Sequence, residues 1–509
     1  MKRLTIASCL LMWILAFLFP ACDGLEDHYS TNPTYRLSFS TDTLAFDTVF
    51  STIGSTTRQF MIYNRNNEPL NIESVMLASG EATGFRMNLD GRKGSLFNNV
   101  GILANDSMYV FVEVTVDPNG GNQPLLIQDS VLFTVNGVRQ SVLLEAYGQD
   151  VHLCKGGITI EKDSLLAADR PYLIYDSLVI APDASIQIEP GATFYMHDKA
   201  NLIVHGSMNA SGSIEHPITF RGDRLDYILN DILPYDRTPG QWGGIRFTAE
   251  SFGNVWENVI VRNGTSGVMC DPSTPDRPKI RIHNSQITNM GGDVFTAFNC
   301  DVTATNSEFS NAGGSVLILS GGSYYLAHCT VANYMSLTQR GAASASPLDS
   351  KSLHLLHNTA VGEAPPYPIL QAHFDNCLID GSFSAGNPLS ATGEIRIVAS
   401  ATNEEEDFDY RFNHCVLKAQ SIESEHFIET LFINPQEPPY RMTGGEANKY
   451  IYDFRLNSVS APGVGQADLE IAREYPMDRY GVNRLSNPNG PTIGAYEFVP
   501  EEDNEETAE

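Results

Sequence analysis

One pattern in the second half of the chain restricts the possible folds more than any other feature. An Asn or His recurs with an apolar residue two positions before it, a small or β-branched residue one position after it and an apolar residue three positions after it. Successive members are 26, 22, 22, 30, 18 and 38 residues apart, by subtraction of their positions. Such spacing is typical of a solenoid with stacked coils of roughly 20–25 residues and insertions between them. The recurring residues are Asn258, Asn284, Asn306, His328, Asn358, Asn376 and His414.

Stacking predicts what lies at each position of this pattern. Strands of adjacent coils lie about 4.8 Å apart, so identical positions touch. We expect the Asn side chains to form a hydrogen-bonded ladder and the small residues to fill an inward position. Cys329, Cys377 and Cys415 occupy that small position, as Ser285 and Ser307 do, and this predicts buried free thiols. The even count of six cysteines after residue 22 also permits disulfides, and no CxxC spacing suggests a metal site.

The stretch 185–212, "SIQIEPGATFYMHDKANLIVHGSMNASG", alternates apolar and polar residues and breaks only at Gly and at Asp-Lys. This alternation predicts short strands, with Ile186, Ile188, Leu202 and Val204 facing inward. The segments "EPGAT", "HDKAN" and "NASG" supply the turns between the strands. The stretch is therefore interpreted as about one and a half coils of solenoid wall.

Longer motifs resemble a known family. "ASIQIEPGATFYMHDKANLIVHGSMNASGSIEHPITFRGD" followed by "QWGGIRF" resembles the opening turns of pectate-lyase-like right-handed parallel β-helix proteins. "FRLNSVSAPGVG", with the later "DRYGVNRLSNPNGPTIGAYEF", resembles their terminal cap, although Thr492 stands where the commoner cap has Asp. The resemblance implies a β-helix over 150–445 and a cap over 446–498 in which the "GAYE" strand closes the last coil. The acidic tail 499–509 is expected to be disordered.

Residues 35–149 differ in character and predict an all-β sandwich. "MYVFVEVTV" places Val110, Val112, Val114 and Val116 on one strand face, and Asn136-Gly137 is a strong hairpin turn signal. "TLAFDTV", "YNRNNEPLNI" and "VLLEAYGQD" resemble immunoglobulin-like domains of the Hydin-related type. The resemblance implies a domain that binds or acts as a spacer. The fold class expected for the whole chain is an immunoglobulin-like β-sandwich followed by a right-handed parallel β-helix.

The N-terminus predicts export. Lys2 and Arg3 precede an apolar run, and "FPACDG" follows it, which is typical of a secretory signal over residues 1–21. Ala21 before Cys22 resembles a bacterial lipobox, although Phe19 stands where Leu is usual. The resemblance implies lipidation of Cys22, a polar tether over 22–34 and an outer-membrane lipoprotein, either periplasmic or surface-exposed. A plain signal peptide with an incidental Cys is the alternative.

Charge and motif content limit the function classes. The net charge of −29 argues against nucleic acid as a partner, because little would neutralise phosphates. Asn-Thr-Asp, Asp-Asp and Gly-His-Gly segments, which polygalacturonases of this fold use, do not occur between residues 150 and 445. No column of carboxylates is evident that would hold Ca²⁺ for a lyase. Arg246, Arg262 and Arg281 are candidate bases, and exposed strand arginines are the favoured interpretation. No catalytic residue, metal ligand or cofactor is predicted.

The insertion 221–244 is the best candidate for a site. Carboxylates beside aromatic residues are typical of sugar binding, since rings stack on aromatic faces and acids bond hydroxyls. The candidate glycan-binding residues are Asp223, Asp226, Tyr227, Tyr235, Asp236 and Arg237, with Asp231 nearby. Trp242 is instead expected to pack against the next coil. For the small polar insertion 336–352 and the acidic run 404–409 no function is predicted.

A further short pattern, Asp followed by a hydroxyl residue and an apolar residue, resembles an O-glycosylation acceptor motif of exported bacterial proteins. The alternative interpretation is that Asp-Ser and Asp-Thr simply begin strands. The hydroxyl residues concerned are Thr43, Thr48, Ser107, Ser130, Ser164 and Ser177.

These observations favour a lipid-anchored cell-envelope protein without catalytic activity, which presents a surface for a glycan or another macromolecule. One alternative is a polysaccharide lyase or glycoside hydrolase of the pectate-lyase-like fold. Another is a structural adhesin or an assembly protein that binds other envelope proteins.

Overall fold

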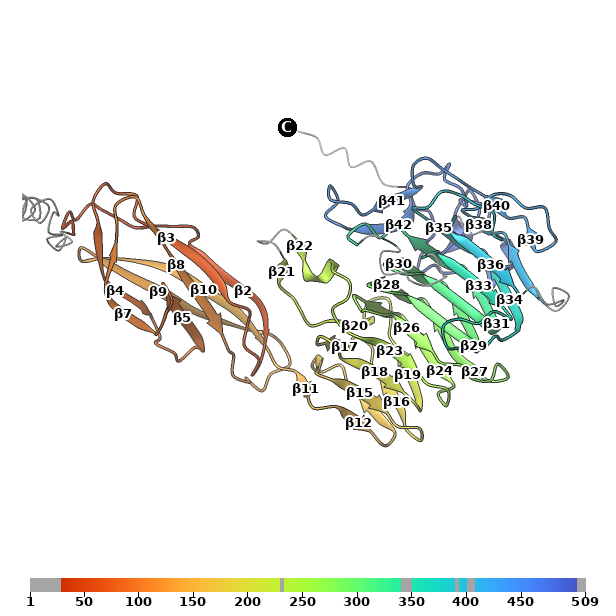
Figure 1. Cartoon of the computed structure of the whole chain (residues 1–509), viewed down its shortest axis with the longest axis horizontal. Coiled ribbons are helices and arrows are strands. Elements are labelled where there is room, and N and C mark those ends of the chain that lie inside the picture. The colour runs from red at the N-terminus through yellow and green to blue at the C-terminus, as the bar shows by residue number, and fades with distance from the viewer. Residues whose placement is uncertain are drawn as a thin grey trace, which may run out of the picture. The chain divides into compact units, whose positions relative to one another are not determined.

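The computed structural model describes residues 29–228, 233–338, 340, 350–389, 393–400 and 408–500. The predicted signal, Cys22, Asp231 and nearly all of the acidic tail lie outside the described residues. The chain divides into two compact units, Met1–Gln149 and Asp150–Glu509, drawn from red to orange and from orange to blue in Figure 1. No helix within the described ranges is both long and apolar enough to cross a membrane.

The first unit contains two five-stranded sheets that enclose one apolar core. Val110, Val112 and Val114 are fully buried between the sheets, as the strand alternation predicts. One sheet has the order β1 (Ser38–Phe39), β3 (Arg58–Tyr63), β8 (Ser107–Val114), β5 (Phe85–Leu89), β6 (Arg92–Lys93). The other has the order β2 (Thr43–Phe50), β10 (Val138–Gln149), β9 (Leu125–Val135), β4 (Leu70–Leu77), β7 (Leu96–Ile102).

The predicted hairpin is present between β9 and β10, where Val135 pairs with Val138. Both turn residues, Asn136 and Gly137, have positive φ, which the two-residue turn of this hairpin requires. Pairing in this unit is antiparallel except between β2 and β10, which run parallel. The turn signal in the sequence therefore located the hairpin correctly, and the parallel pair was not foreseen.

The second unit consists mainly of two long parallel sheets, an arrangement consistent with a β-helix (Figure 1). A full coil supplies one strand to an 11-stranded sheet and two strands to a 17-stranded sheet. The 11-stranded sheet is formed by β11 (His152–Cys154), β14 (Tyr172–Ile174), β17 (Thr193–Met196), β20 (Ile218–Gly222), β25 (Val259–Arg262), β28 (Gln286–Met290), β30 (Glu308–Ala312), β32 (Thr330–Asn333), β35 (Leu378–Gly381), β38 (Val416–Leu417) and β40 (Leu431–Phe432).

The 17-stranded sheet turns a corner in each coil, so that two of its strands follow one another along the chain. In β29 and β31 both stretches form one continuous strand. Its members are β12 (Ile158–Ile160), β13 (Ser164–Leu166), β15 (Ser177–Ile180), β16 (Ser185–Ile188), β18 (Asn201–Val204), β19 (Ser207–Ser211), β23 (Gly244–Phe247), β24 (Asn254–Glu257), β26 (Val268–Cys270), β27 (Pro278–His283), β29 (Phe295–Thr305), β31 (Leu317–Ala327), β33 (Leu353–His357), β34 (Ile369–Asp375), β36 (Ile395–Ala399), β37 (Tyr410–Asn413) and β39 (Phe427–Ile428).

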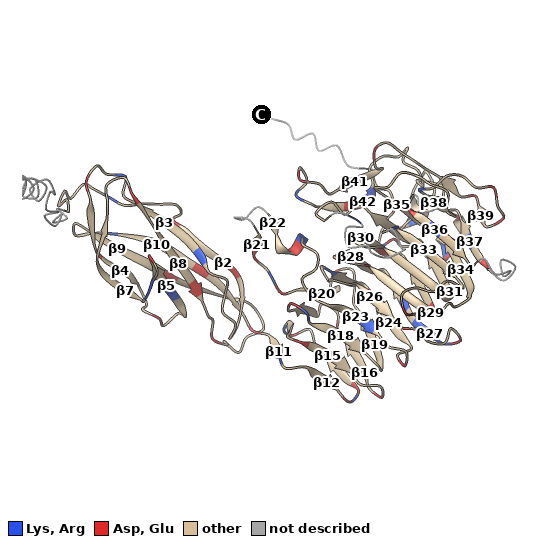
Figure 2. Cartoon of the chain, viewed as in Figure 1, with Lys and Arg blue, Asp and Glu red and all other residues tan. Residues whose placement is uncertain are grey.

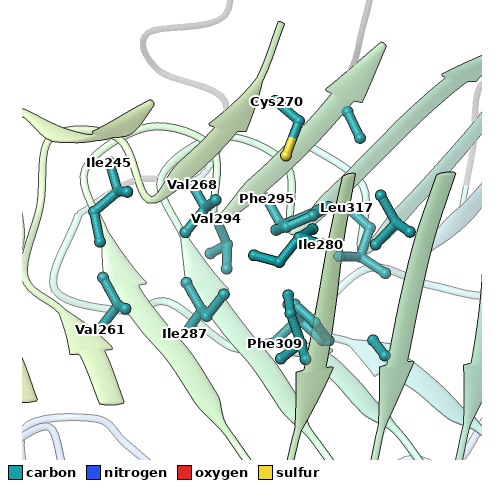
Figure 3. Packing of buried hydrophobic residues seen from close by; sticks show 14 of the residues in the cluster. Ile245, Val261, Val268, Cys270, Ile280, Ile287, Val294, Phe295, Phe309 and Leu317 are labelled. Carbon is teal, nitrogen blue, oxygen red and sulfur yellow. The ribbon is translucent and has the colours of Figure 1, made fainter. Parts of the chain in front are cut away.

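Inward-facing residues of the two sheets form one continuous core. Figure 3 shows Ile245 and Val268 from one sheet facing Val261, Ile287 and Phe309 from the other. Aromatic residues also stack in register between coils. The rings of Tyr172 and Phe194 lie 4.8 Å apart, and those of Phe194 and Phe220 lie 4.6 Å apart. The four inward residues predicted in the stretch 185–212 are all buried in this core.

The recurring Asn and His residues form left-handed corners. All seven have φ between 48° and 53°, a region that Asn adopts more readily than most residues because its short side chain bonds locally. The amide of Asn284 donates to Oδ1 of Asn258 at 2.5 Å, one rung of the predicted ladder. The conformation at the corner therefore explains why the pattern is built on Asn.

Asn358 is not a member of the stacked column, so one assignment in the repeat is wrong. Ala327 pairs with Asp375, and Nδ2 of Asn376 donates to Nε2 of His328 at 3.0 Å. Asn358 follows β33, which stacks on the first half of β31 at a different corner. The coil between His328 and Asn376 is thus 48 residues long and contains an insertion. A strand followed by a corner gives the same local pattern wherever it occurs.

A second Asn column lies at the other end of the same strands. Asn263, Asn289 and Asn311 also have positive φ, and Nδ2 of Asn289 donates to Oδ1 of Asn263 at 2.7 Å. Each stands five residues after a member of the first column. This constant offset is visible in the sequence and could have identified the second column.

The predicted free thiols are confirmed. Cys329, Cys377 and Cys415 are fully buried and unpaired, and burial raises the pKa of the Cys329 and Cys377 thiols. Ser307 accepts a hydrogen bond from the backbone N–H of Ser285 at 3.1 Å, and Cys415 accepts one from Cys377 at 3.4 Å. Small side chains with a weak acceptor therefore fill one inward column from coil to coil.

The C-terminal segment corrects the expectation of a cap that closes the last coil. Gly494 donates to the carbonyl of Asn376, and Ala495 donates to the hydroxyl of Thr330, so this segment crosses several coils. It covers outward-facing apolar residues such as Leu378 and Val416, which would otherwise face solvent. The elements of this region are β41 (Tyr440–Thr443), β42 (Tyr452–Leu456), α2 (Leu469–Glu474) and the 3₁₀ turn η3 (Arg484–Ser486).

His328 lies beneath this covering segment and is fully buried. Burial lowers its pKa well below the usual value, and the nearby Arg484 guanidinium lowers it further. The unfolded chain takes up this proton near pH 6.5, whereas the folded chain keeps the ring neutral. The contribution of His328 to folding stability is therefore complete above that pH and is lost as the pH falls below it.

We expect His328→Asn, which places in the column the residue found at most of its other corners, to reduce this pH dependence. The wild-type chain should lose up to about 1.4 kcal/mol per pH unit from this group below pH 6.5, and the variant should lose correspondingly less. Urea unfolding at pH 7.5 and 5.5 measures the difference. Equal losses in the two proteins would contradict the assignment.

Candidate functional site

The predicted insertion leaves β20 and returns at β23. It contains β21 (Tyr227–Ile228), β22 (Leu233–Pro234) and the 3₁₀ turn η1 (Tyr235–Arg237). Figure 2 shows an acidic and a basic residue together on this turn. Of the six candidate residues, all except Tyr227 make a described polar or cation–π contact. These contacts determine what the insertion can do.

Asp236 lies between two arginines of neighbouring strands. Its Oδ1 atom is 3.0 Å from Nη2 of Arg221 and 3.0 Å from Nη2 of Arg262. Burial lowers the pKa of Arg262, the neighbouring Arg221 lowers it as well, and Asp236 opposes both effects. The backbone carbonyl of Asp236 also accepts a hydrogen bond from Asn263 at 2.9 Å. The carboxylate therefore relieves a repulsion between two outward-facing cations and holds the turn against the sheet.

Asp226 and Tyr235 share a single cation, Arg224. The guanidinium donates to both oxygens of Asp226, at 2.7 and 2.5 Å, and lies 4.1 Å from the centre of the Tyr235 ring. Such a two-pronged ion pair fixes the plane of the carboxylate. These three side chains form a rigid polar cluster on the insertion.

Asp223 bonds to His197, with 2.6 Å between Oδ2 and Nδ1. The imidazole stacks on Tyr175 with 4.0 Å between ring centres. Burial raises the pKa of Asp223, and the bond to His197 opposes that effect. His197 lies in the "HDKAN" turn, so the turn residue and the insertion are brought together.

The remaining members differ in exposure. Tyr227 is 42% exposed, which leaves its ring available to a ligand. Arg237 donates to the backbone carbonyl of Lys449 at 2.9 Å, so the insertion contacts the C-terminal segment. Trp242 is fully buried and donates from Nε1 to the carbonyl of Arg262 at 2.9 Å, as expected for a residue that packs against the next coil.

The contacts of the insertion hold its carboxylates in fixed positions. Within the described part of the insertion, each of the three candidate carboxylates has a cationic or imidazole partner. No group of three or more His, Cys, Asp or Glu residues that could hold a metal occurs among the described residues. The carboxylates and guanidiniums of this segment, which also contains the exposed Tyr227, can offer ordered hydrogen bonds to hydroxyls.

A stripe of polar side chains on the 17-stranded sheet was not predicted. In-register pairing aligns Arg281, Thr303, Tyr325, His373 and Arg411 on successive strands. His373 bonds to Asp409 at 3.0 Å and to Gln371 at 2.9 Å, and Arg411 lies 3.2 Å from the buried Asp375. The stripe becomes visible only when the 48-residue coil is placed correctly.

A buried charge network was also missed. Arg340, from the insertion with no predicted function, donates to both oxygens of Glu394 at 3.0 and 2.9 Å, and its guanidinium lies 3.8 Å from the ring centre of Phe383. Ser352 donates to the same carboxylate at 2.8 Å. Glu394 is fully buried. An irregular insertion carries no periodic signal, so the sequence pattern could not reveal this anchor.

A related cluster surrounds Asp380. Its Oδ2 atom accepts from the hydroxyls of Tyr334 and Tyr440 at 2.9 and 3.0 Å, and Lys418 lies 3.5 Å from Oδ1. Burial raises the pKa of Asp380, and Lys418 opposes this. Tyr440 belongs to the C-terminal segment, so this buried carboxylate ties that segment to the sheet.

The candidate O-glycosylation residues lie in strands. Thr43, Ser107, Ser164 and Ser177 are the first residues of β2, β8, β13 and β15. The preceding Asp can bond to backbone at the strand entry: Asp163 accepts from the N–H of Ser185, and Asp176 accepts from that of Gly156, both at 2.8 Å. These contacts give the motif a structural role at strand starts, and its glycosylation stays a prediction.

Comparison with known proteins does not assign the chain to a family. No family model matches the chain, and no curated protein matches it. Solved structures match parts of it. A family 123 glycoside hydrolase from Clostridium perfringens is 8% identical over 24% of this chain and 31% of its own, with a TM-score of 0.17. A PapD-like domain of human CEP192 is 9% identical over 26% of this chain and 96% of its own, with a TM-score of 0.16.

The Arg340–Glu394 pair yields a stability prediction. Arg340→Met leaves a buried carboxylate without its cation and should lower the free energy of unfolding by about 3–5 kcal/mol. The double variant Arg340→Met/Glu394→Met removes both charges and should recover most of that loss. Urea unfolding of the wild type, both single variants and the double variant measures the coupling. Additive losses would show that the pair does not act as a unit.

Proposed function

We propose that the protein is a lipid-anchored cell-envelope protein that binds a glycan without catalytic activity. In this proposal the first unit is an immunoglobulin-like domain and the second is a right-handed parallel β-helix of the pectate-lyase-like type. The observation that supports binding is the insertion 221–244, in which fixed charged side chains lie in the same short segment as the exposed Tyr227. The ionic partners of its carboxylates weigh against a lyase or hydrolase.

The binding surface in this proposal is a preformed polar cluster. Arg224 fixes the carboxylate of Asp226, and Arg221 with Arg262 fixes that of Asp236. Four arginines, including Arg237, accompany the three described carboxylates in this segment and at its base, and Arg237 has no ionic partner among the described residues. An acidic glycan with hydroxyls to bond and a ring to stack on Tyr227 is the ligand that fits such a surface.

Tyr227→Ala tests the proposal with little risk to folding, because the side chain is exposed. The full chain is applied to an array of acidic and neutral glycans, with Tyr147→Ala as the matched control, since Tyr147 is similarly exposed in the first unit. We expect acidic glycans to bind and Tyr227→Ala to weaken binding about tenfold while Tyr147→Ala does not. New reducing ends or unsaturated uronates after incubation with polysaccharides would contradict the absence of catalysis.

Anchoring is tested separately. Cys22→Ser, expressed from the full chain in a diderm bacterium, should release the protein from the membrane fraction and abolish acylation, because the modified thiol is absent. Membrane fractionation with a labelled fatty acid gives the readout. A variant that stays acylated and membrane-bound would overturn the assignment of Cys22.

A further inference from the structure

A groove lies on the outer face of the first unit, far in sequence from the insertion 221–244. It has a volume of about 470 Å³. Phe85, Met87 and Leu89 point into the core, so the alternate residues of β5 face outward. The same alternation turns Tyr109, Phe111 and Glu113 of β8 outward. The residues that line the groove include Glu81, Arg86, Asn88, Lys93, Phe111 and Glu113.

Strand register arranges these residues in rows. Phe111 pairs with Asn88, and Asn88 pairs with Lys93, so an aromatic ring, an amide and an ammonium follow one another across three strands. In the next row Arg86 pairs with Glu113, and their side chains form an ion pair at 3.1 Å. The groove therefore combines one flat apolar surface with hydrogen-bonding groups at fixed positions.

Two aromatic rings form the apolar part. Tyr109 and Phe111 lie 5.8 Å apart with an angle of 24° between their planes. Tyr109 is 45% exposed, and its ring adjoins that of Phe111, which lines the groove. The two rings are offset and nearly parallel, so they place an aromatic surface beside the polar outward residues Arg86, Asn88 and Glu113.

Two polar groups of the groove have unused bonding capacity. Oδ1 of Asn88 is buried and has no hydrogen-bond partner, and an unsatisfied buried oxygen is costly. The terminal torsion of Asn is soft, so a ligand that brings a donor can satisfy this oxygen after a small rotation. The Lys93 ammonium has no described ionic or hydrogen-bond partner within the residues that the structure covers, and it supplies donors.

We propose that this groove is a second binding site and that it takes a neutral sugar ring. A pyranose has an apolar face for the aromatic pair, hydroxyl donors for Asn88 and hydroxyl acceptors for Lys93. The charges of Arg86 and Lys93 balance those of Glu81 and Glu113, so the groove favours a neutral ligand over an acidic one.

The test measures binding of neutral hexasaccharides, namely cellohexaose, xylohexaose and mannohexaose, to the full chain by calorimetry. We expect at least one of them to bind. Tyr109→Ala and Lys93→Ala should each weaken that binding, the former about tenfold, because one removes a stacking face and the other a donor. Tyr147→Ala, an exposed Tyr outside the groove, serves as the matched control and should bind as the wild type does.

Two controls distinguish this site from the glycan surface of the second unit: the acidic ligand oligogalacturonate and the variant Tyr227→Ala. Neutral binding should survive Tyr227→Ala. Absence of neutral binding, or neutral binding that Tyr109→Ala and Lys93→Ala leave intact, overturns the groove proposal whatever happens to acidic glycans. If Tyr227→Ala loses binding only to acidic glycans, the result supports the proposed function and does not affect the groove proposal.

Discussion

Contact between identical positions of successive coils is the constraint on which the second unit depends. Parallel strands about 4.8 Å apart place like residues against each other, so a side chain must suit both its own coil and its neighbours. Corners are the difficult points, because the chain must turn sharply at the same place in each coil. Asn solves this by adopting a left-handed conformation while its amide bonds to the next Asn, as Asn284 does to Asn258.

The same constraint decides what could be predicted from the sequence. The inward columns, the free thiols and the burial of Trp242 follow from the repeat, because stacking ties each residue type to a position. Asn358 was assigned to the wrong corner, since a strand and its corner look alike in the sequence wherever they occur. The anchor formed by Arg340 and Glu394 could not be foreseen, because it joins irregular segments that have no period.

The candidate site shows a similar division. The composition of the insertion predicted Asp223, Asp226 and Asp236 as members of one site. The structure places them in one insertion, with partners that the sequence did not identify. Those partners, His197, Arg224, Arg221 and Arg262, come from a turn, the insertion itself and two strands. Arg224 lies only two residues from Asp226, whereas the pairing of Asp223 with His197 and of Asp236 with Arg262 depends on register, which a single sequence does not specify. The candidate carboxylates are consequently part of a fixed polar surface, whereas the sequence presented them as free acids.

The decisive measurement compares Asn284→Gly with Asn284→Val by urea unfolding of the full chain. Both substitutions remove the amide of the ladder, but only glycine adopts the corner conformation without strain. If left-handed corners control stacking, the valine variant should be less stable than the glycine variant by roughly 1–2 kcal/mol. Equal stabilities, or a less stable glycine variant, would contradict the central role of these corners.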